Sequence, residues 1–163
     1  MAEKLQKEFL EMLDQCQGIV MKVCLFFTDH QPANIEDLYQ DIVSVLWESY
    51  PRFRRQSKLS TWVYTVALNT AVMHRRSRNP KFVALTQEMC ENIADTGGDK
   101  QVDRLYQLID RLDAKDRTLL FLYLDKVPQR DIAHMLNTSE DTINKRISRL
   151  KQKLKKMNDN EPE

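Results

Sequence analysis

Apolar residues recur every three or four positions from the start of the chain, which is the spacing of an amphipathic helix. A first helix is predicted from Leu5 to about residue 29, because polar residues and Pro32 then interrupt the pattern. The positions expected to face the core are Leu5, Phe9, Leu13, Cys16, Val20, Val23 and Phe27.

Two further helices are predicted before residue 80. The second begins at an N-cap formed by Asn34 and stops before Pro51, which cannot continue a helix. Its inward residues are Ile35, Leu38, Ile42, Val45 and Leu46. The third, capped by Ser60 or Thr61, runs to about Arg76, and its apolar residues are Trp62, Val66, Leu68 and Met73. Three such helices can form one bundle, so residues 1–80 are predicted to be a helical domain.

The periodicity is lost after Pro80 and returns at Val102. Gly97 and Gly98 lie between them, so residues 81–101 are predicted to be a flexible linker. The apolar positions beyond it are Val102, Leu105, Leu108, Ile109 and Leu112, then Leu119, Leu120, Leu122 and Tyr123 after an N-cap at Asp116. Few Gly and Pro and many helix formers favour an all-α class. We therefore expect two small helical domains, residues 1–80 and 102–157, joined by a flexible linker.

A helix-turn-helix is predicted within residues 127–146. Ala133 is the small residue needed where two helices cross closely, and Asn137 can adopt the left-handed conformation of a tight turn. Thr138 or Ser139 can cap the following helix, whose apolar stripe is Ile143, Ile147, Leu150 and Leu154. Polar side chains outside this stripe can contact base edges and phosphates in a major groove. A plain helical hairpin with a solvated basic face is the alternative.

The charge distribution supports a nucleic-acid partner, although the net charge is only +1. Basic residues form three clusters, residues 52–58, 75–81 and 145–156, whereas acidic residues predominate in 8–48 and 88–116. Such segregation creates local positive fields that suit phosphate backbones. Ordinary solvated helix faces are the alternative for each cluster.

Other classes of protein have little support in the sequence. The three cysteines lack CxxC spacing and the three histidines are scattered, so no metal site is expected and a reducing compartment fits best. No apolar run approaches the roughly 18 residues of a membrane span, so a cytoplasmic protein without direct membrane insertion is predicted. No phosphate loop or nucleophile motif indicates an enzyme, and no cofactor is expected.

Two more stretches carry candidate binding chemistry. Residues 58–69 place Trp62 and Tyr64 between basic clusters, where aromatic rings can hold unstacked bases. Residues two apart cannot share a helix face, so at least one ring is expected in the core, and Trp62 is the better candidate. Residues 37–48 place acidic and amide groups on one helix face, for which a solvated surface is the alternative.

In this order the three stretches resemble the extracytoplasmic-function group of bacterial sigma factors, over nearly the whole chain. Residues 37–41 match the family's Asp-Leu-x-Gln-Asp/Glu pattern, and residues 61–69 are similar to its Thr-Trp-Leu-Tyr-x-Ile-Ala-x-Asn pattern. Residues 131–133 and 142–143 resemble its Glu-Ile-Ala core and Thr-Val recognition-helix start. The chain departs from the family at Thr65 and Leu68, where basic residues are usual, and at Asn137, where Gly is common.

The resemblance implies a factor that binds core RNA polymerase, directs promoter-specific initiation and helps to open promoter DNA. The residues implied to bind core polymerase are Asp37, Leu38, Gln40, Asp41, Ser44, Trp47 and Glu48. Those implied at the minus-ten element are Arg54, Arg55, Gln56, Ser57, Lys58, Thr61, Trp62, Tyr64, Asn69, Arg75, Arg76 and Arg78. Those implied at the minus-thirty-five element are Thr142, Asn144, Lys145, Arg146, Ser148, Arg149, Lys151 and Gln152. The family also implies an anti-sigma factor as partner. An autonomous helix-turn-helix regulator and a helical adaptor without DNA contact are the alternatives.

Overall fold

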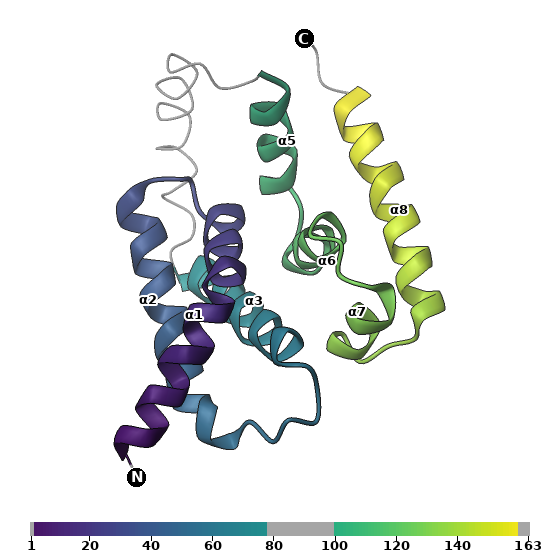
Figure 1. Ribbon diagram of the computed structural model, residues 1–163. Helices are drawn as coiled ribbons and strands as arrows, with labels where there is room; N and C mark the ends of the chain where they lie inside the picture. The colour runs from purple at the N-terminus through teal and green to yellow at the C-terminus, as the bar shows by residue number, and fades with distance from the viewer. Residues whose placement is uncertain (1, 78–99, 160–163) are drawn as a thin grey trace. The chain divides into compact units, whose positions relative to one another are not determined.

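The computed structural model describes residues 2–77 and 100–159. These residues form seven α-helices and one short 3₁₀ helix, with no strand among them, which confirms the predicted all-α class. The chain divides into two compact units, Met1–Asn79 and Pro80–Glu163 (Figure 1). The predicted linker, residues 81–101, lies outside the described residues except at its end. Lys100 and Gln101 already belong to a helix, two residues before the predicted start of the second domain.

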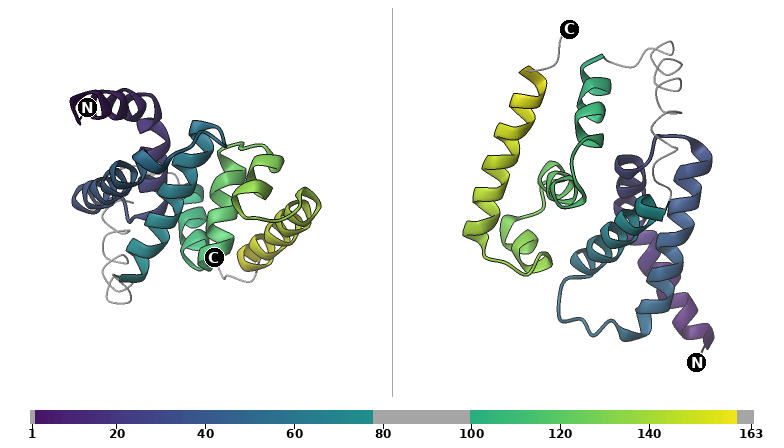
Figure 2. Two further views of the ribbon diagram at one scale, coloured as in Figure 1. Left: turned by 90° about the horizontal axis from the view of Figure 1, so that it is seen from below. Right: turned by 180° about the vertical axis from the view of Figure 1, so that it is seen from behind.

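The first unit is a three-helix bundle. Helix α1 spans Ala2–Phe27, α2 spans Pro32–Ser49, the 3₁₀ helix η1 spans Tyr50–Arg52, and α3 spans Leu59–Ser77. Helix α3 packs against both α1 and α2 (Figures 1 and 2). The fully buried side chains of this unit are Val20, Val23, Cys24, Leu38, Ile42, Leu46, Val63, Ala67 and Ala71.

Helix α2 begins earlier than the sequence predicted. Its first residue is Pro32, and Gln31 occupies the N-cap position without a side-chain capping bond. The predicted Asn34 cap is therefore wrong, because proline at the first helical position already has the backbone angle of a helix. Asn34 lies within the first turn, where its amide nitrogen donates to Asp29 Oδ1 at 2.9 Å.

Helix α3 also begins before its predicted cap. The backbone N–H of Trp62 donates to the carbonyl of Lys58 at 3.1 Å, so Ser60 and Thr61 lie inside the first turn. The helix ends at Ser77, close to the predicted end. Met73, predicted among its inward residues, is exposed.

The second unit contains four helices. Helix α5 spans Lys100–Asp110, α6 spans Ala114–Leu124, α7 spans Gln129–Met135, and α8 spans Glu140–Asp159. Helix α8 packs against the other three helices, and the views of Figures 1 and 2 both show it running beside α5. The most deeply buried side chains are Ile109, Leu122, Ile132 and Ile143, while the predicted inward residue Leu105 is exposed.

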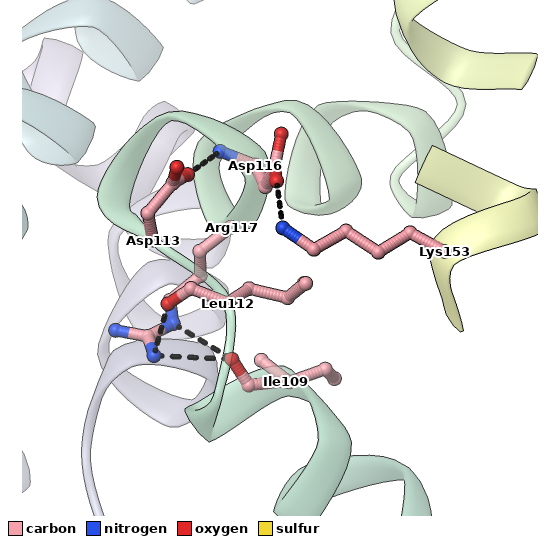
Figure 3. Close-up of polar contacts among 6 residues, drawn as sticks. All are labelled: Ile109, Leu112, Asp113, Asp116, Arg117 and Lys153. Carbon is pink, nitrogen blue, oxygen red and sulfur yellow. Dashed lines mark hydrogen bonds and ion pairs between the residues drawn. The ribbon is translucent and has the colours of Figure 1, made fainter. Parts of the chain in front are cut away.

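The start of α6 corrects another predicted cap. Asp113, and not Asp116, is the N-cap, because its Oδ1 accepts the backbone N–H of Asp116 at 2.8 Å. Asp116 lies in the first turn, and its Oδ2 accepts a hydrogen bond from Lys153 Nζ at 3.1 Å. This contact connects α6 to α8 (Figure 3).

A buried arginine closes the end of α5. The Arg117 side chain is 3% exposed, and its guanidinium points at the last carbonyls of α5 and the turn that follows (Figure 3). Nη2 donates to the carbonyls of Ile109 at 3.0 Å, Asp110 at 3.0 Å and Leu112 at 3.2 Å. Nε donates to Ile109 as well, at 3.3 Å. The Ile109 carbonyl also accepts the backbone N–H of Leu112 at 3.0 Å. Because the last carbonyls of a helix have no partner one turn further along it, Arg117 supplies donors for the end of α5 and the turn after it.

Candidate nucleic-acid interface

Helices α7 and α8 form the predicted helix-turn-helix. Asn137 has a φ of 53°, which confirms the left-handed turn residue. The backbone N–H of Thr138 donates to the carbonyl of Ala133 at 2.9 Å, and Ala133 is buried where the helices meet. Ser139 Oγ accepts the backbone N–H of Thr142 at 3.1 Å, so Ser139 is the cap among the two predicted candidates.

Helix α8 separates its apolar and polar residues as the sequence predicted. Ile143, Ile147 and Leu150 are buried, and Leu154 is half-buried. Among the predicted contact residues Thr142 is half-buried, and the exposed ones are Asn144, Lys145, Arg146, Ser148, Arg149, Lys151 and Gln152. The exposed face therefore carries amide, hydroxyl and cationic donors, the groups that contact base edges and phosphates.

Two lysines among the predicted DNA-contact residues of α8 have partners within the unit. Lys145 Nζ lies 3.2 Å from Asp141 Oδ2, one turn earlier on the helix, and both side chains are exposed. Lys151 Nζ lies 4.5 Å from the centre of the Tyr123 ring, which attracts a cation through its π face. An exposed ion pair is worth roughly 0–1 kcal/mol, so the Lys145 pair is weak enough to be exchanged for a phosphate contact.

The loop of residues 53–58 joins η1 to α3 and carries the predicted base-pocket residues. Arg54, Arg55, Gln56 and Lys58 are exposed, and Ser57 is half-buried. Arg55 has a φ of 56°, and the left-handed region costs a side-chain-bearing residue roughly 1–2 kcal/mol. The loop therefore holds an exposed arginine in a strained backbone conformation.

Aromatic rings anchor this loop to the bundle. The rings of Phe53 and Trp62 lie 4.8 Å apart between centroids, and Tyr50 lies 6.3 Å from Trp62. Phe9 of α1 continues the contacts to Tyr50 at 5.6 Å and to Trp47 at 5.0 Å. Trp62 is thus half-buried, consistent with the expectation that it has a packing role.

The other α3 residues predicted at the minus-ten element are not all on the surface. Thr61 is 7% exposed, which corrects its assignment as a DNA contact. It lies seven residues before buried Leu68, so the two share a side of the helix. Because position 68 is buried, it suits the apolar leucine that replaces the basic residue usual in the family. The remaining residues are half-buried Tyr64 and Arg75 and exposed Asn69, while the Arg76 side chain and Arg78 lie outside the described residues.

Helix α2 presents the predicted acidic face. Most of its members are exposed, namely Gln40, Asp41, Ser44, Trp47 and Glu48, while Asp37 is half-buried. Leu38 is 1% exposed and lies in the core with Ile42 and Leu46 at four-residue spacing. Its predicted contact with polymerase is corrected, because this side chain does not reach the surface.

His74 of α3 joins the acidic face, and the sequence did not predict it. Its Nδ1 lies 2.7 Å from Asp41 Oδ2, and its Nε2 lies 3.8 Å from Asp37 Oδ2. The contact brings together residues separated by 33 positions. A histidine immediately before a basic cluster looks like part of that cluster, so only the packing of α3 on α2 reveals its partners.

Two protein-family models match the chain, one over each unit. Residues 12–80 match sigma-70 region 2, and residues 103–154 match sigma-70 region 4. The chain belongs to the sigma-70 family. As a sigma factor it directs transcription initiation, and the predicted membership of the extracytoplasmic-function group is confirmed. No curated protein sequence matches the chain.

Solved structures of other sigma factors share this fold. The sigma factor RpoE, in complex with the anti-sigma factor NepR from Bartonella quintana, is 18% identical with a TM-score of 0.63. That similarity covers 96% of this chain and 99% of RpoE. CnrH, in complex with the cytosolic domain of CnrY, is 18% identical with a TM-score of 0.68, over 96% of this chain and 91% of CnrH.

The region 2 match of this sigma factor includes the acidic face and the loop of residues 53–58, and the region 4 match includes the helix-turn-helix. Within residues 2–77 and 100–159, no helix is both long and apolar enough to cross a membrane. The same residues contain no group of His, Cys, Asp or Glu suited to a metal ion. Burial raises the pKa of the Cys24 thiol to about 12, so this cysteine is a neutral core residue.

Proposed function

We propose that this sigma factor reads the minus-thirty-five element through the exposed face of α8, within a domain of residues 102–157. The observation that carries this proposal is the separation of the helix into a buried stripe and a polar face. Asn144 and Arg149 are exposed on that face and bear donors suited to base edges. Lys145 and Arg146 provide charge for the flanking phosphates.

The domain of residues 1–80 binds the minus-ten element through the loop of residues 53–58. Arg54, Arg55 and Lys58 of this loop are exposed, and the contact between the Phe53 and Trp62 rings holds the start of the loop against α3. Arginine planes and cationic groups suit an unstacked base and its phosphates. Asn69 and Arg75 of α3 are further proposed contacts, and Arg76 and Arg78 are proposed from the sequence alone.

The same domain binds core RNA polymerase through the acidic face, defined as Asp37, Gln40, Asp41, Ser44, Trp47 and Glu48. An exposed tryptophan beside carboxylates is the kind of surface that forms a protein interface, because the ring buries a large area and the charges select a basic partner. The polymerase carries out the chemistry, and the factor acts as a non-enzymatic specificity subunit in the cytoplasm.

An anti-sigma factor is a further partner of this chain. RpoE and CnrH have related folds, and their structures contain NepR and the cytosolic domain of CnrY respectively. A protein that covers the polymerase- or promoter-binding surfaces of the present chain would hold it inactive.

The experiment that tests the proposal combines binding and transcription. The purified chain should co-elute with core polymerase and direct transcripts from a cognate promoter selected from a DNA library. An Arg149→Ala variant should co-elute normally but lose transcripts, whereas Lys155→Ala, at an exposed position near the end of α8, is the matched control. Promoter binding by the chain alone, without any effect of polymerase, would instead favour an autonomous regulator.

A further inference from the structure

We infer that His74 is a positioning residue for polymerase binding: it fixes the carboxylate of Asp41 on the acidic face. The inference rests on the proposed function of that face. It adds a residue that belongs to a different helix and that does not itself have to touch the polymerase.

The geometry gives His74 the role of a donor. An ionised carboxylate can only accept hydrogen bonds, so the 2.7 Å contact requires that Nδ1 of His74 donates to Asp41 Oδ2. The other ring nitrogen faces Asp37 Oδ2 at 3.8 Å. Asp37 and Asp41 lie one turn apart on α2, where like charges repel, and the ring lies close to both.

The His74 imidazole is much more buried than the two carboxylates beside it. The His74 side chain is 12% exposed, whereas that of Asp41 is 51% exposed and that of Asp37 is 37% exposed. The imidazole is therefore held by the packing of α3 on α2, while the carboxylates remain accessible to a partner. This is the arrangement of a rigid support beneath a surface contact.

A fixed carboxylate binds a cationic partner more tightly than a mobile one. An exposed aspartate without support samples several side-chain rotamers and loses that freedom on binding. A hydrogen bond already present in the free protein removes part of this cost. From the usual entropy of one immobilised side chain, loss of the support should weaken polymerase binding about 3- to 10-fold.

The experiment compares three variants of the full chain by their affinity for core polymerase. His74→Leu removes the donor, whereas the amide nitrogen of His74→Asn occupies about the position of Nδ1 and should keep the bond. Leu should weaken binding about 3- to 10-fold, and Asn should stay within about 2-fold of the parent. His134→Leu, an exposed histidine in the second unit, is the matched control and should bind normally.

A double-mutant cycle separates positioning from folding. Combined with Asp41→Asn, His74→Leu should have little further effect, because the carboxylate that it positions is already gone. Equal weakening in both backgrounds, or weakening by Asn as severe as by Leu, would make His74 a merely structural residue and overturn the inference. Thermal melting of each variant identifies losses that come from unfolding.

The binding data also distinguish failure of the His74 inference from failure of the proposed polymerase-binding face. If Asp41→Asn weakens binding while His74→Leu binds like the parent, the acidic face stands and the role of His74 is rejected. If Asp41→Asn itself binds like the parent, the assignment of Asp41 to the polymerase-binding face is wrong, and the inference fails with it.

Discussion

Replacement of Arg117 by methionine tests how the second unit is held together. The substitution keeps most of the side-chain volume but removes the charge and every donor. The carbonyls of Ile109, Asp110 and Leu112 then lose the four hydrogen bonds that Arg117 makes with them. No methionine atom can replace these donors.

The expected loss follows from the burial of these groups. A buried acceptor that loses its donor costs about 1–3 kcal/mol. The carbonyls of Asp110 and Leu112 are affected in this way, whereas that of Ile109 keeps the backbone N–H of Leu112 at 3.0 Å. Removal of a buried charge recovers part of that sum, because the guanidinium no longer has to be desolvated. We expect a net loss of about 2–4 kcal/mol, the penalty for two such carbonyls less that recovery. A unit of this size has a total stability near the lower end of about 5–15 kcal/mol, so only a small margin of stability should remain.

Hydrogen exchange on the full chain measures this loss unit by unit. Peptides from α6 and α8 should lose most of their protection in Arg117→Met, while peptides from α1 and α2 should keep theirs. Both tryptophans, Trp47 and Trp62, lie in the first unit, so tryptophan emission should be unchanged. Arg146→Met makes the same substitution at an exposed position of α8 and serves as the control.

The reasoning would be refuted by protection in α6 and α8 that matches the Arg146→Met control. Such a result would mean that the carbonyls of Asp110 and Leu112 find other donors at little cost. Arg117→Lys gives a second check, since a single ammonium can bond only some of these carbonyls and should produce an intermediate loss.

Three further predictions concern the surfaces and the core. Lys145→Ala and Arg149→Ala should weaken promoter use without weakening polymerase binding. Where a base contact is removed, about 1–3 kcal/mol of discrimination between bases should be lost. Transcription at the parental level by both variants would reject α8 as the recognition helix. Asp41→Lys should reduce co-elution with core polymerase at moderate salt, because the charge on the acidic face is reversed; unchanged affinity would move the docking face elsewhere. The Cys24 thiol should resist alkylation at pH 8 in the folded protein, because a pKa of about 12 instead of 9.0 lowers its thiolate fraction about a thousandfold. Mass spectrometry should find Cys24 labelled only after denaturation. Rapid labelling of the folded chain would contradict its burial.

Features set by short stretches of sequence were predicted well. The turn at Asn137, a cap at one of the two candidates Thr138 and Ser139, and the buried stripe that begins at Ile143 depend on residues within one or two turns. Local backbone geometry and helical periodicity are enough to fix them. The all-α class and the regions of the family follow from the same signals.

Caps were less predictable where several polar residues lie close together. Asp113 and Asp116 are equally suitable cap residues, and the backbone conformation at Asp113 decided between them. At α2, Pro32 set the start of the helix upstream of Asn34. A choice between neighbouring polar residues depends on where the preceding element ends, which the sequence does not state.

Contacts between distant elements lay beyond sequence reasoning. Arg117 appears in the sequence as an ordinary charged residue of a helix, yet it is buried against the end of α5. His74 meets Asp41 only because α3 packs across α2. Leu38 matched a family pattern for polymerase binding, although its own four-residue spacing with Ile42 already predicted burial.

The division of α8 into two faces has an evolutionary consequence. The residues that hold the helix in the unit, Ile143, Ile147 and Leu150, are distinct from the exposed residues proposed to read DNA, such as Asn144 and Arg149. Substitutions on the exposed face therefore change few core contacts and should carry little risk of misfolding. A duplicated copy of this sigma factor can diverge in promoter preference one residue at a time while every intermediate remains folded. The same independence makes α8 a suitable helix on which to engineer a factor that ignores the promoters of its parent.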